Sequence, residues 1–122
     1  LLPLMLTAAA QGRLSLPDVA RLLSERASVL FHFPRKGRLE LGRDADLALV
    51  DLAHEWTYDH RRAVTRSRES MRAYDGLSLR GRVVSTYVRG RRVFHEGEVT
   101  AEPGYGRFIR PERAELGRVV TG

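Results

Sequence analysis

The chain has 122 residues, 43% of them hydrophobic, which is enough for one domain with one modest core. It contains no cysteine, which excludes disulfides, a thiol nucleophile and a cysteine-based zinc site. Its net charge of +6 comes from arginines scattered among acids without a block of like charge, a pattern that argues against nucleic-acid binding. No apolar run approaches the ~18 residues of a membrane span, so we expect no membrane contact and a cytoplasmic protein.

The chain opens on an apolar segment. Residues 2–11 are apolar on almost every side, which predicts a helix buried in a larger body, and Gly12 is placed to end it. Leu1 stands where an initiator methionine would, so we expect a portion of a longer or trimmed protein. On its own this helix would leave its leucines uncovered, which predicts aggregation or association of the isolated chain.

A second helix is the firmest local prediction. Ser15 and Asp18 form a capping-box pattern, and Pro17 is tolerated in a first helical turn. A separate short turn of helix is expected over residues 28–31, ending before Pro34. The apolar residues that recur at helical spacing are Val19, Leu22 and Leu23.

After the helices the hydrophobic periodicity changes. Residues 38–41, RLEL, alternate as a half-buried strand does, and residues 46–51, DLALVD, predict a short strand buried on both faces. Residues 54–82 hold neither periodicity for long, which predicts a loop-rich segment with about one helical turn.

Two strand-forming runs follow within residues 83–99, on either side of Arg89 and Gly90, which predicts a β-hairpin that Gly97 closes. Residues 103–122 are rich in proline and glycine and should run over a surface. Because this tail also carries Tyr105, Phe108 and Ile109, it is a candidate intersubunit strap.

The residue types that carry chemistry do not form a recognisable site. His32, His54, His60 and His95 lack the pairwise spacing of metal-hydrolase ligands and are interpreted as structural or surface residues. The serines lack a suitably spaced base, and the RGRR run at 89–92 could hold a phosphate but in a hairpin more often faces solvent. Asp44, Asp46 and Asp51 share no cleft by any sequence argument. The first two are expected to organise the turn before the strand through bonds from side chain to backbone.

The segment KGRLELGRDADLALVDL, residues 36–52, resembles a signature of the amidohydrolase superfamily. In those enzymes the chain leaves a (β/α)8 barrel at this point and returns to a small β-sandwich. The resemblance implies that Gly42 and Asp44 shape a tight turn and that residues 46–51 form a central sandwich strand. The matching residues are Lys36, Gly37, Gly42, Asp44, Ala45, Asp46, Leu47 and Asp51.

Two more stretches resemble the cyclic-amide hydrolases of this superfamily, the allantoinases, dihydroorotases and hydantoinases. Residues 15–31 resemble their last barrel helix, with Ala27 where proline is common. Residues 74–99 resemble their closing segment, in which an aromatic-x-Gly pair and a Leu-x-Gly precede the final hairpin. The LRGRV and VRG motifs favour allantoinase slightly.

The resemblance implies an α/β chain made of the last helices of a TIM-like (β/α)8 barrel plus the C-terminal part of a small composite β-sandwich. The expected division is residues 1–34 for the barrel helices, 35–102 for the sandwich segment and 103–122 for the tail. The implied activity is hydrolysis of a C–N bond in a small cyclic amide, within a homo-oligomer.

The cofactor that the resemblance implies is a binuclear divalent metal centre, with zinc as the expected metal, which activates water and polarises the ring carbonyl. Its ligands would all precede Leu1, so no catalytic, cofactor-binding or metal-binding residue is assigned in this chain, which is expected to bind no metal and to be inert alone. An alternative remains open, a stand-alone inactive interaction module that docks on a complete homologue.

Overall fold

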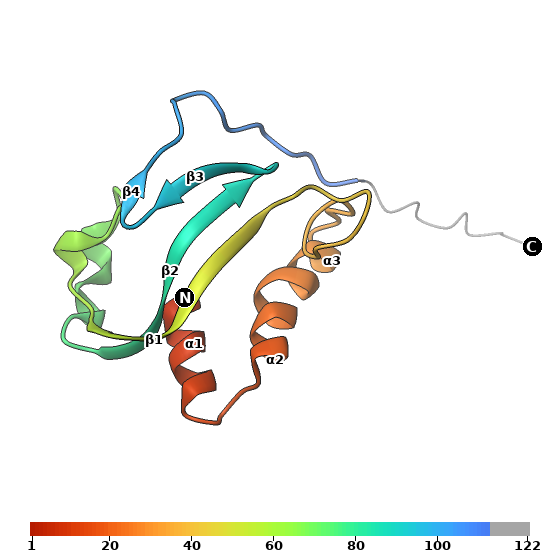
Figure 1. Cartoon of the computed structure of the whole chain (residues 1–122). Coiled ribbons are helices and arrows are strands. Elements are labelled where there is room, and N and C mark those ends of the chain that lie inside the picture. The colour runs from red at the N-terminus through yellow and green to blue at the C-terminus, as the bar shows by residue number, and fades with distance from the viewer. Residues whose placement is uncertain (113–122) are drawn as a thin grey trace, which may run out of the picture.

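The computed structural model describes residues 1–112, in which two helical segments pack beside a twisted antiparallel sheet (Figure 1). Helix α1 spans Leu2–Ala10, and the second segment consists of α2, Leu16–Ala20, a π-helical turn, Arg21–Glu25, and α3, Arg26–Leu30. Both predicted helices are confirmed. In this part of the chain no helix has the length and apolar character needed to cross a membrane.

The second helical segment begins at the predicted capping box. The Ser15 hydroxyl accepts the Asp18 N–H at 3.2 Å, and the Asp18 carboxylate accepts the Ser15 N–H at 3.3 Å. The short helical turn expected around residues 28–31, ending before Pro34, lies in α3, which the π-helical turn joins to α2 without a break. His32, with φ +56°, then ends it in the left-handed region, where its N–H reaches the Val29 carbonyl at 3.2 Å.

The sheet has the order β1-β2-β3-β4, and its strands are all antiparallel to their neighbours. Its strands are β1, Leu47–Thr57, β2, Ser78–Val88, β3, Arg91–His95, and β4, Glu98–Val99. The predicted hairpin is confirmed: Arg89 and Gly90, with φ +50° and +78°, form the tight β2–β3 turn. Glu96 and Gly97 repeat this geometry between β3 and β4, with φ +46° and +94°.

The two strands predicted before residue 52 had different outcomes, and the first was wrong. Residues 38–41 pair with no strand among residues 1–112 and form turns that leave Leu41 fully exposed, because alternating hydrophobicity cannot supply a hydrogen-bonding partner. The strand predicted at 46–51 is confirmed as the start of the longer β1, but among the described residues it is not buried on both faces. Within the described chain β1 lies at the sheet edge, and Leu49 is 49% exposed.

The acid that ends the apolar run shapes a bulge in β1. Asp51 pairs with Arg82 and Glu55 pairs with Arg80, so residues 52–54 of β1 lie opposite Gly81 alone. The Asp51 carboxylate holds the extra residues by accepting the backbone N–H of residues 53 and 54 at 2.9 and 3.2 Å. The segment expected to be loop is therefore partly strand at both ends, with 3₁₀ turns His60–Arg62 and Arg68–Tyr74 between β1 and β2.

Helix α1 meets the sheet at Gly81. A Cβ built on this glycine, whose φ is +92°, would lie 2.9 Å from the Leu6 Cβ. The hydroxyl of Thr7 accepts the Arg80 N–H at 2.9 Å, and the Trp56 indole donates to the Gly81 carbonyl at 3.1 Å. Leu6 is thus buried rather than uncovered, contrary to expectation.

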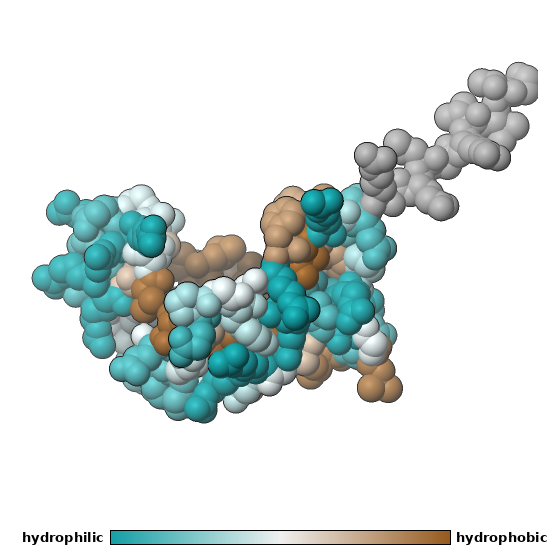
Figure 2. All heavy atoms as spheres, turned by 90° about the horizontal axis from the view of Figure 1, so that it is seen from above, coloured by the Kyte–Doolittle hydropathy of each residue, from teal (hydrophilic) through white to brown (hydrophobic). Residues whose placement is uncertain are grey.

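The described residues do not enclose a full core. The buried hydrophobic side chains among them are Leu6, Val19 and Leu79, and large apolar side chains such as Leu30 and Phe31 at the end of α3 are more than half exposed. Figure 2 shows hydrophobic residues lining a hollow that opens towards the top edge of the view. A chain of this size normally buries far more of its apolar surface, so these faces lack a cover.

Candidate functional site

A cluster of charged residues links the segment before β1 to the β2–β3 turn. Its members, called the lysine cluster below, are Lys36, Asp44 and Asp46. The Lys36 ammonium lies 2.9 Å from the Asp44 carboxylate and also pairs with Asp46. Asp46 accepts the backbone N–H of Arg89 at 2.8 Å, and the Gly90 N–H donates to the Ala45 carbonyl at 2.9 Å.

The electrostatics of this cluster favour its charged forms. The hydrogen bond from Lys36 holds the pKa of Asp44 below its ordinary value, and Arg35, 3.0 Å from the same carboxylate, adds to the effect. Burial alone would lower the pKa of Lys36, but the hydrogen bonds to Asp46 and Asp44 outweigh it and raise that pKa. Each charged group of the lysine cluster has an oppositely charged partner, so the cluster has a structural role.

This geometry refines the roles expected for the two acids. Gly42, with φ +85°, does shape a tight turn, in which the Arg43 N–H donates to the Glu40 carbonyl at 3.1 Å. Asp44 binds side chains, however, and the backbone N–H that Asp46 accepts belongs to a turn 43 residues away. The expectation that Asp46 organises its own turn was therefore wrong.

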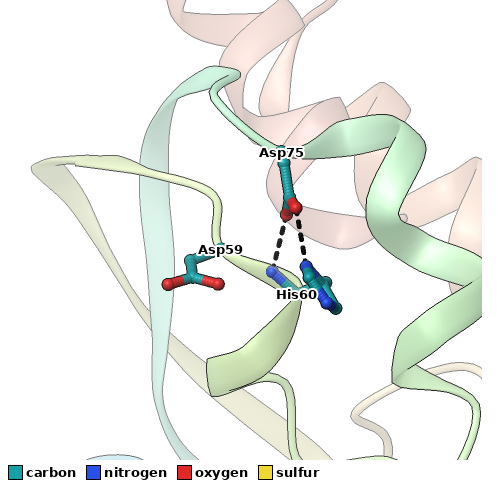
Figure 3. A group of neighbouring side chains, drawn as sticks. All are labelled: Asp59, His60 and Asp75. Atoms are coloured by element: carbon teal, nitrogen blue, oxygen red, sulfur yellow. Dashed lines mark hydrogen bonds and ion pairs between the residues drawn. The ribbon is translucent and has the colours of Figure 1, made fainter.

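A second polar group, the His60 cluster, consists of Asp59, His60 and Asp75 (Figure 3). His60 is 8% exposed, and its Nδ1 lies 2.6 Å from one Asp75 carboxylate oxygen. The other Asp75 oxygen accepts the His60 backbone N–H at 2.7 Å. The hydrogen bond to the backbone of His60 lowers the pKa of Asp75. Sequence inspection could not reveal this pairing because 15 residues separate the two partners.

The His60 cluster was tested as a metal site because three potential ligand atoms lie within 4.8 Å of one another. It does not fit a metal ion. Both oxygens of Asp59 accept from Arg61, which lowers the pKa of Asp59 to about 2, and both oxygens of Asp75 face His60. Each of these carboxylate oxygens, like His60 Nδ1, therefore already has a hydrogen-bond partner within the protein. The cluster instead closes the loop between β1 and β2, beside the bond from the Gly76 N–H to the Tyr58 carbonyl.

The other histidines stand apart from this cluster. His95 forms a hydrogen bond of 2.8 Å with Ser85, opposite it in the β2–β3 pair, but Ser85 is 3% exposed and offers no access to a substrate. Sequence inspection missed this pair because a register shift between Thr86 and Tyr87 decides which residues face each other. Among residues 1–112 the His60 cluster is the one group that meets metal-site spacing, so the four histidines form no joint site.

The RGRR run contacts the tail. The guanidinium carbons of Arg89 and Arg91 lie 4.5 and 5.0 Å from the centre of the Tyr105 ring. Arg89 also donates to the Tyr105 carbonyl at 2.7 Å. Arg89 is half-buried by this contact, whereas Arg91 remains exposed as expected, although its guanidinium also lies over the ring.

Similarities to known proteins cover almost the whole chain. It is 45% identical over 114 residues to an allantoinase of Rubrobacter xylanophilus, a match that covers 93% of this chain and 24% of the relative. It is 37% identical over 119 residues to an L-hydantoinase of Paenarthrobacter aurescens, covering 96% of this chain and 26% of the relative. A dihydroorotase of Methanothermobacter thermautotrophicus is 38% identical over 111 residues, covering 91% of this chain and 25% of the relative. No family profile matches.

Solved structures agree with these sequence similarities. An L-hydantoinase from Arthrobacter aurescens superimposes with a TM-score of 0.77 at 36% identity, covering 88% of this chain and 24% of that one. A D-hydantoinase from Thermus sp. gives a TM-score of 0.81 at 29% identity, covering 91% of this chain and 24% of that one. Fold and sequence thus both match this chain to a portion of these longer proteins. The chain belongs to the amidohydrolase family that contains the allantoinases, hydantoinases and dihydroorotases, and it corresponds to a C-terminal portion of them, about a quarter of their length.

Proposed function

We propose that this chain is the C-terminal part of a metal-dependent enzyme that hydrolyses the C–N bond of a small cyclic amide. The observation that carries the proposal is its match, along about nine-tenths of its length, to enzymes named for three such activities. Among these substrates an allantoin-type ring is favoured, because the relatives at 45% and 42% identity are both allantoinases. Dihydroorotate and hydantoin are the alternatives.

In this proposal residues 1–34 are the last helices of a (β/α)8 barrel, residues 35–102 belong to a composite β-sandwich, and residues 103–122 form the tail. The uncovered apolar side chains of α3 support the first assignment, since a barrel helix packs one face against the barrel strands. Among residues 1–112 one edge of β1 has no neighbouring strand, which supports the second assignment, because a strand inside a sandwich sheet has a neighbour on each side.

The proposed metal centre is binuclear, with zinc as the metal, and its ligands lie outside this chain. The His60 cluster supports this location of the ligands, because its carboxylates already accept hydrogen bonds from Arg61 and from His60. The isolated chain would accordingly retain no metal and open no ring. The enzyme would act in the cytoplasm as a homo-oligomer, with the cyclic amide as its small-molecule partner.

A chimera tests the proposal. The matching C-terminal part of the Rubrobacter xylanophilus allantoinase is replaced by this chain, and ring opening of allantoin, dihydroorotate and hydantoin is measured with zinc present. We expect a folded, active chimera with allantoin as the best substrate, and no turnover by the isolated chain. A folded chimera that retains metal but opens none of the three rings would contradict the proposal, as would turnover by the isolated chain.

A further inference from the structure

The tail leaves the sheet through a tight turn that directs it back towards the β2–β3 turn. The Tyr105 N–H donates to the Glu102 carbonyl at 3.3 Å, with Pro103 and Gly104 as the two central residues. Gly104 has φ +90°, the value that the third position of a type II turn requires, and proline suits the second. The local sequence EPGY therefore determines where Tyr105 lies.

Tyr105 is anchored by several independent contacts. Its hydroxyl donates to the Val88 carbonyl at 2.8 Å, and its own carbonyl accepts from the Arg89 guanidinium at 2.7 Å. The guanidinium groups of Arg89 and Arg91 both lie against its ring. Charge–ring contacts and hydrogen bonds thus hold one side chain on the end of the β2–β3 hairpin.

The far end of the tail has a much weaker attachment. The Glu112 N–H donates to the His32 carbonyl at 2.9 Å, just past the end of α3. Between the two attachments Phe108 is 88% exposed, so the intervening residues cover little. Glu112 forms one wall of a cavity of about 340 Å³ whose other walls include Val29, Phe33 and Arg43. Figure 1 shows the tail running from β4 past the β2–β3 turn to α3.

We propose that residues 103–112 are a strap latched at Tyr105, and that release of this latch also frees Glu112 and opens the cavity beside α3. Anchoring one end of a short segment raises the effective concentration of the other end at its contact. A single backbone hydrogen bond at a surface opens readily by itself. The bond at Glu112 therefore depends on the contacts of Tyr105, although the two sites share no residue. This inference does not rest on the proposed function.

Amide hydrogen exchange on the full chain tests the strap. We expect Tyr105→Ala to speed exchange of the Glu112 amide by about tenfold, because opening of the strap is then no longer opposed by the latch. Phe108→Ala is the matched control, since that side chain lies in the same segment and is 88% exposed. It should leave the Glu112 amide unchanged. An unchanged Glu112 amide in Tyr105→Ala, or an equal effect in Phe108→Ala, would overturn the proposal.

A second variant covers the case in which Tyr105→Ala unfolds the sheet, which faster exchange of the β1–β2 amides would reveal. Tyr105→Phe keeps the ring under Arg89 and Arg91 and loses the bond to the Val88 carbonyl. We expect a smaller rise at Glu112 with the β1–β2 amides unchanged. No rise at Glu112 in this variant would overturn the coupling.

Discussion

Two junctions that hold the sheet to other parts of the chain differ in kind. At the first, α1 lies against β2 where Gly81 leaves no room for a side chain. At the second, the partly exposed charges of the lysine cluster tie the segment before β1 to the β2–β3 turn. A steric junction tolerates almost no added atom, whereas an ionic junction near solvent loses only part of its energy when one partner is removed. Substitutions at the steric junction should therefore destabilise the fold more than substitutions at the ionic junction.

The largest effect is expected at Gly81. Gly81→Ala must displace Leu6, whose Cβ would be 2.9 Å from the new atom, and must also hold a positive φ. We expect a loss of about 2–4 kcal/mol in the free energy of unfolding, measured by urea denaturation. The matched control is Gly76→Ala, where φ is +82° but nothing lies within 4 Å. It should cost only about 1 kcal/mol, and equal losses would refute the steric account.

A smaller loss is expected at the ionic junction. Lys36→Met removes the ammonium that Asp44 and Asp46 share and leaves two partly buried carboxylates facing each other. The expected cost is about 1–2 kcal/mol in the same urea experiment. Arg21→Met breaks an exposed pair with Asp18 and should stay within about 0.5 kcal/mol of the parent. If both variants lost the same amount, the lysine cluster would be no more than surface charge.

The ionic junction should also make stability depend on pH, while the steric junction should not. The lowered pKa of Asp44 means that the unfolded state binds more protons below its ordinary value of 3.8. The stabilisation is therefore present above that value and lost as pH falls through the lowered pKa. Urea titrations at a series of acidic pH values should show a shallower decline for Asp44→Asn than for the parent chain. A decline of unchanged steepness would contradict the assignment.

The smallest expected effect is a gain at the end of α3. His32 holds φ +56° at the position where a helix usually ends in glycine. His32→Gly should raise the free energy of unfolding by about 0.5–1 kcal/mol, because the strain of the left-handed conformation disappears. Thermal unfolding measures it, with His54→Gly, whose φ is not positive, as a control expected to lose stability. A loss in His32→Gly would show that the imidazole contributes more than the strain costs.

Local signals predicted the elements that local chemistry determines. The Ser15 capping box and the β2–β3 turn at Arg89 and Gly90 were foreseeable because each depends on residues within four positions. The false strand at residues 38–41 had the right periodicity but no partner, and periodicity alone cannot reveal that. Signature residues could be recognised in the sequence. That Asp46 binds the N–H of Arg89 could not, because it depends on how the sheet folds back.

Sites formed by residues far apart in the sequence could not be predicted either, because they too depend on how the chain folds back on itself. His60 and Asp75 are brought together only when the loop between β1 and β2 closes, and Ser85 faces His95 only through a shifted register. The stacking of Arg89 and Arg91 on Tyr105 required the tail to return to the hairpin. For the catalytic groups, family resemblance supplied the prediction that they lie in a region outside this chain.

The most direct test of the central claim is the mass of the native polypeptide, detected in its source cells with an antibody raised against residues 35–102. Our account predicts a band several times larger than the 13.8 kDa of this chain, because the proposed barrel and its metal ligands must be part of the same polypeptide. A band at 13.8 kDa would contradict the account and favour a stand-alone module that docks on a partner.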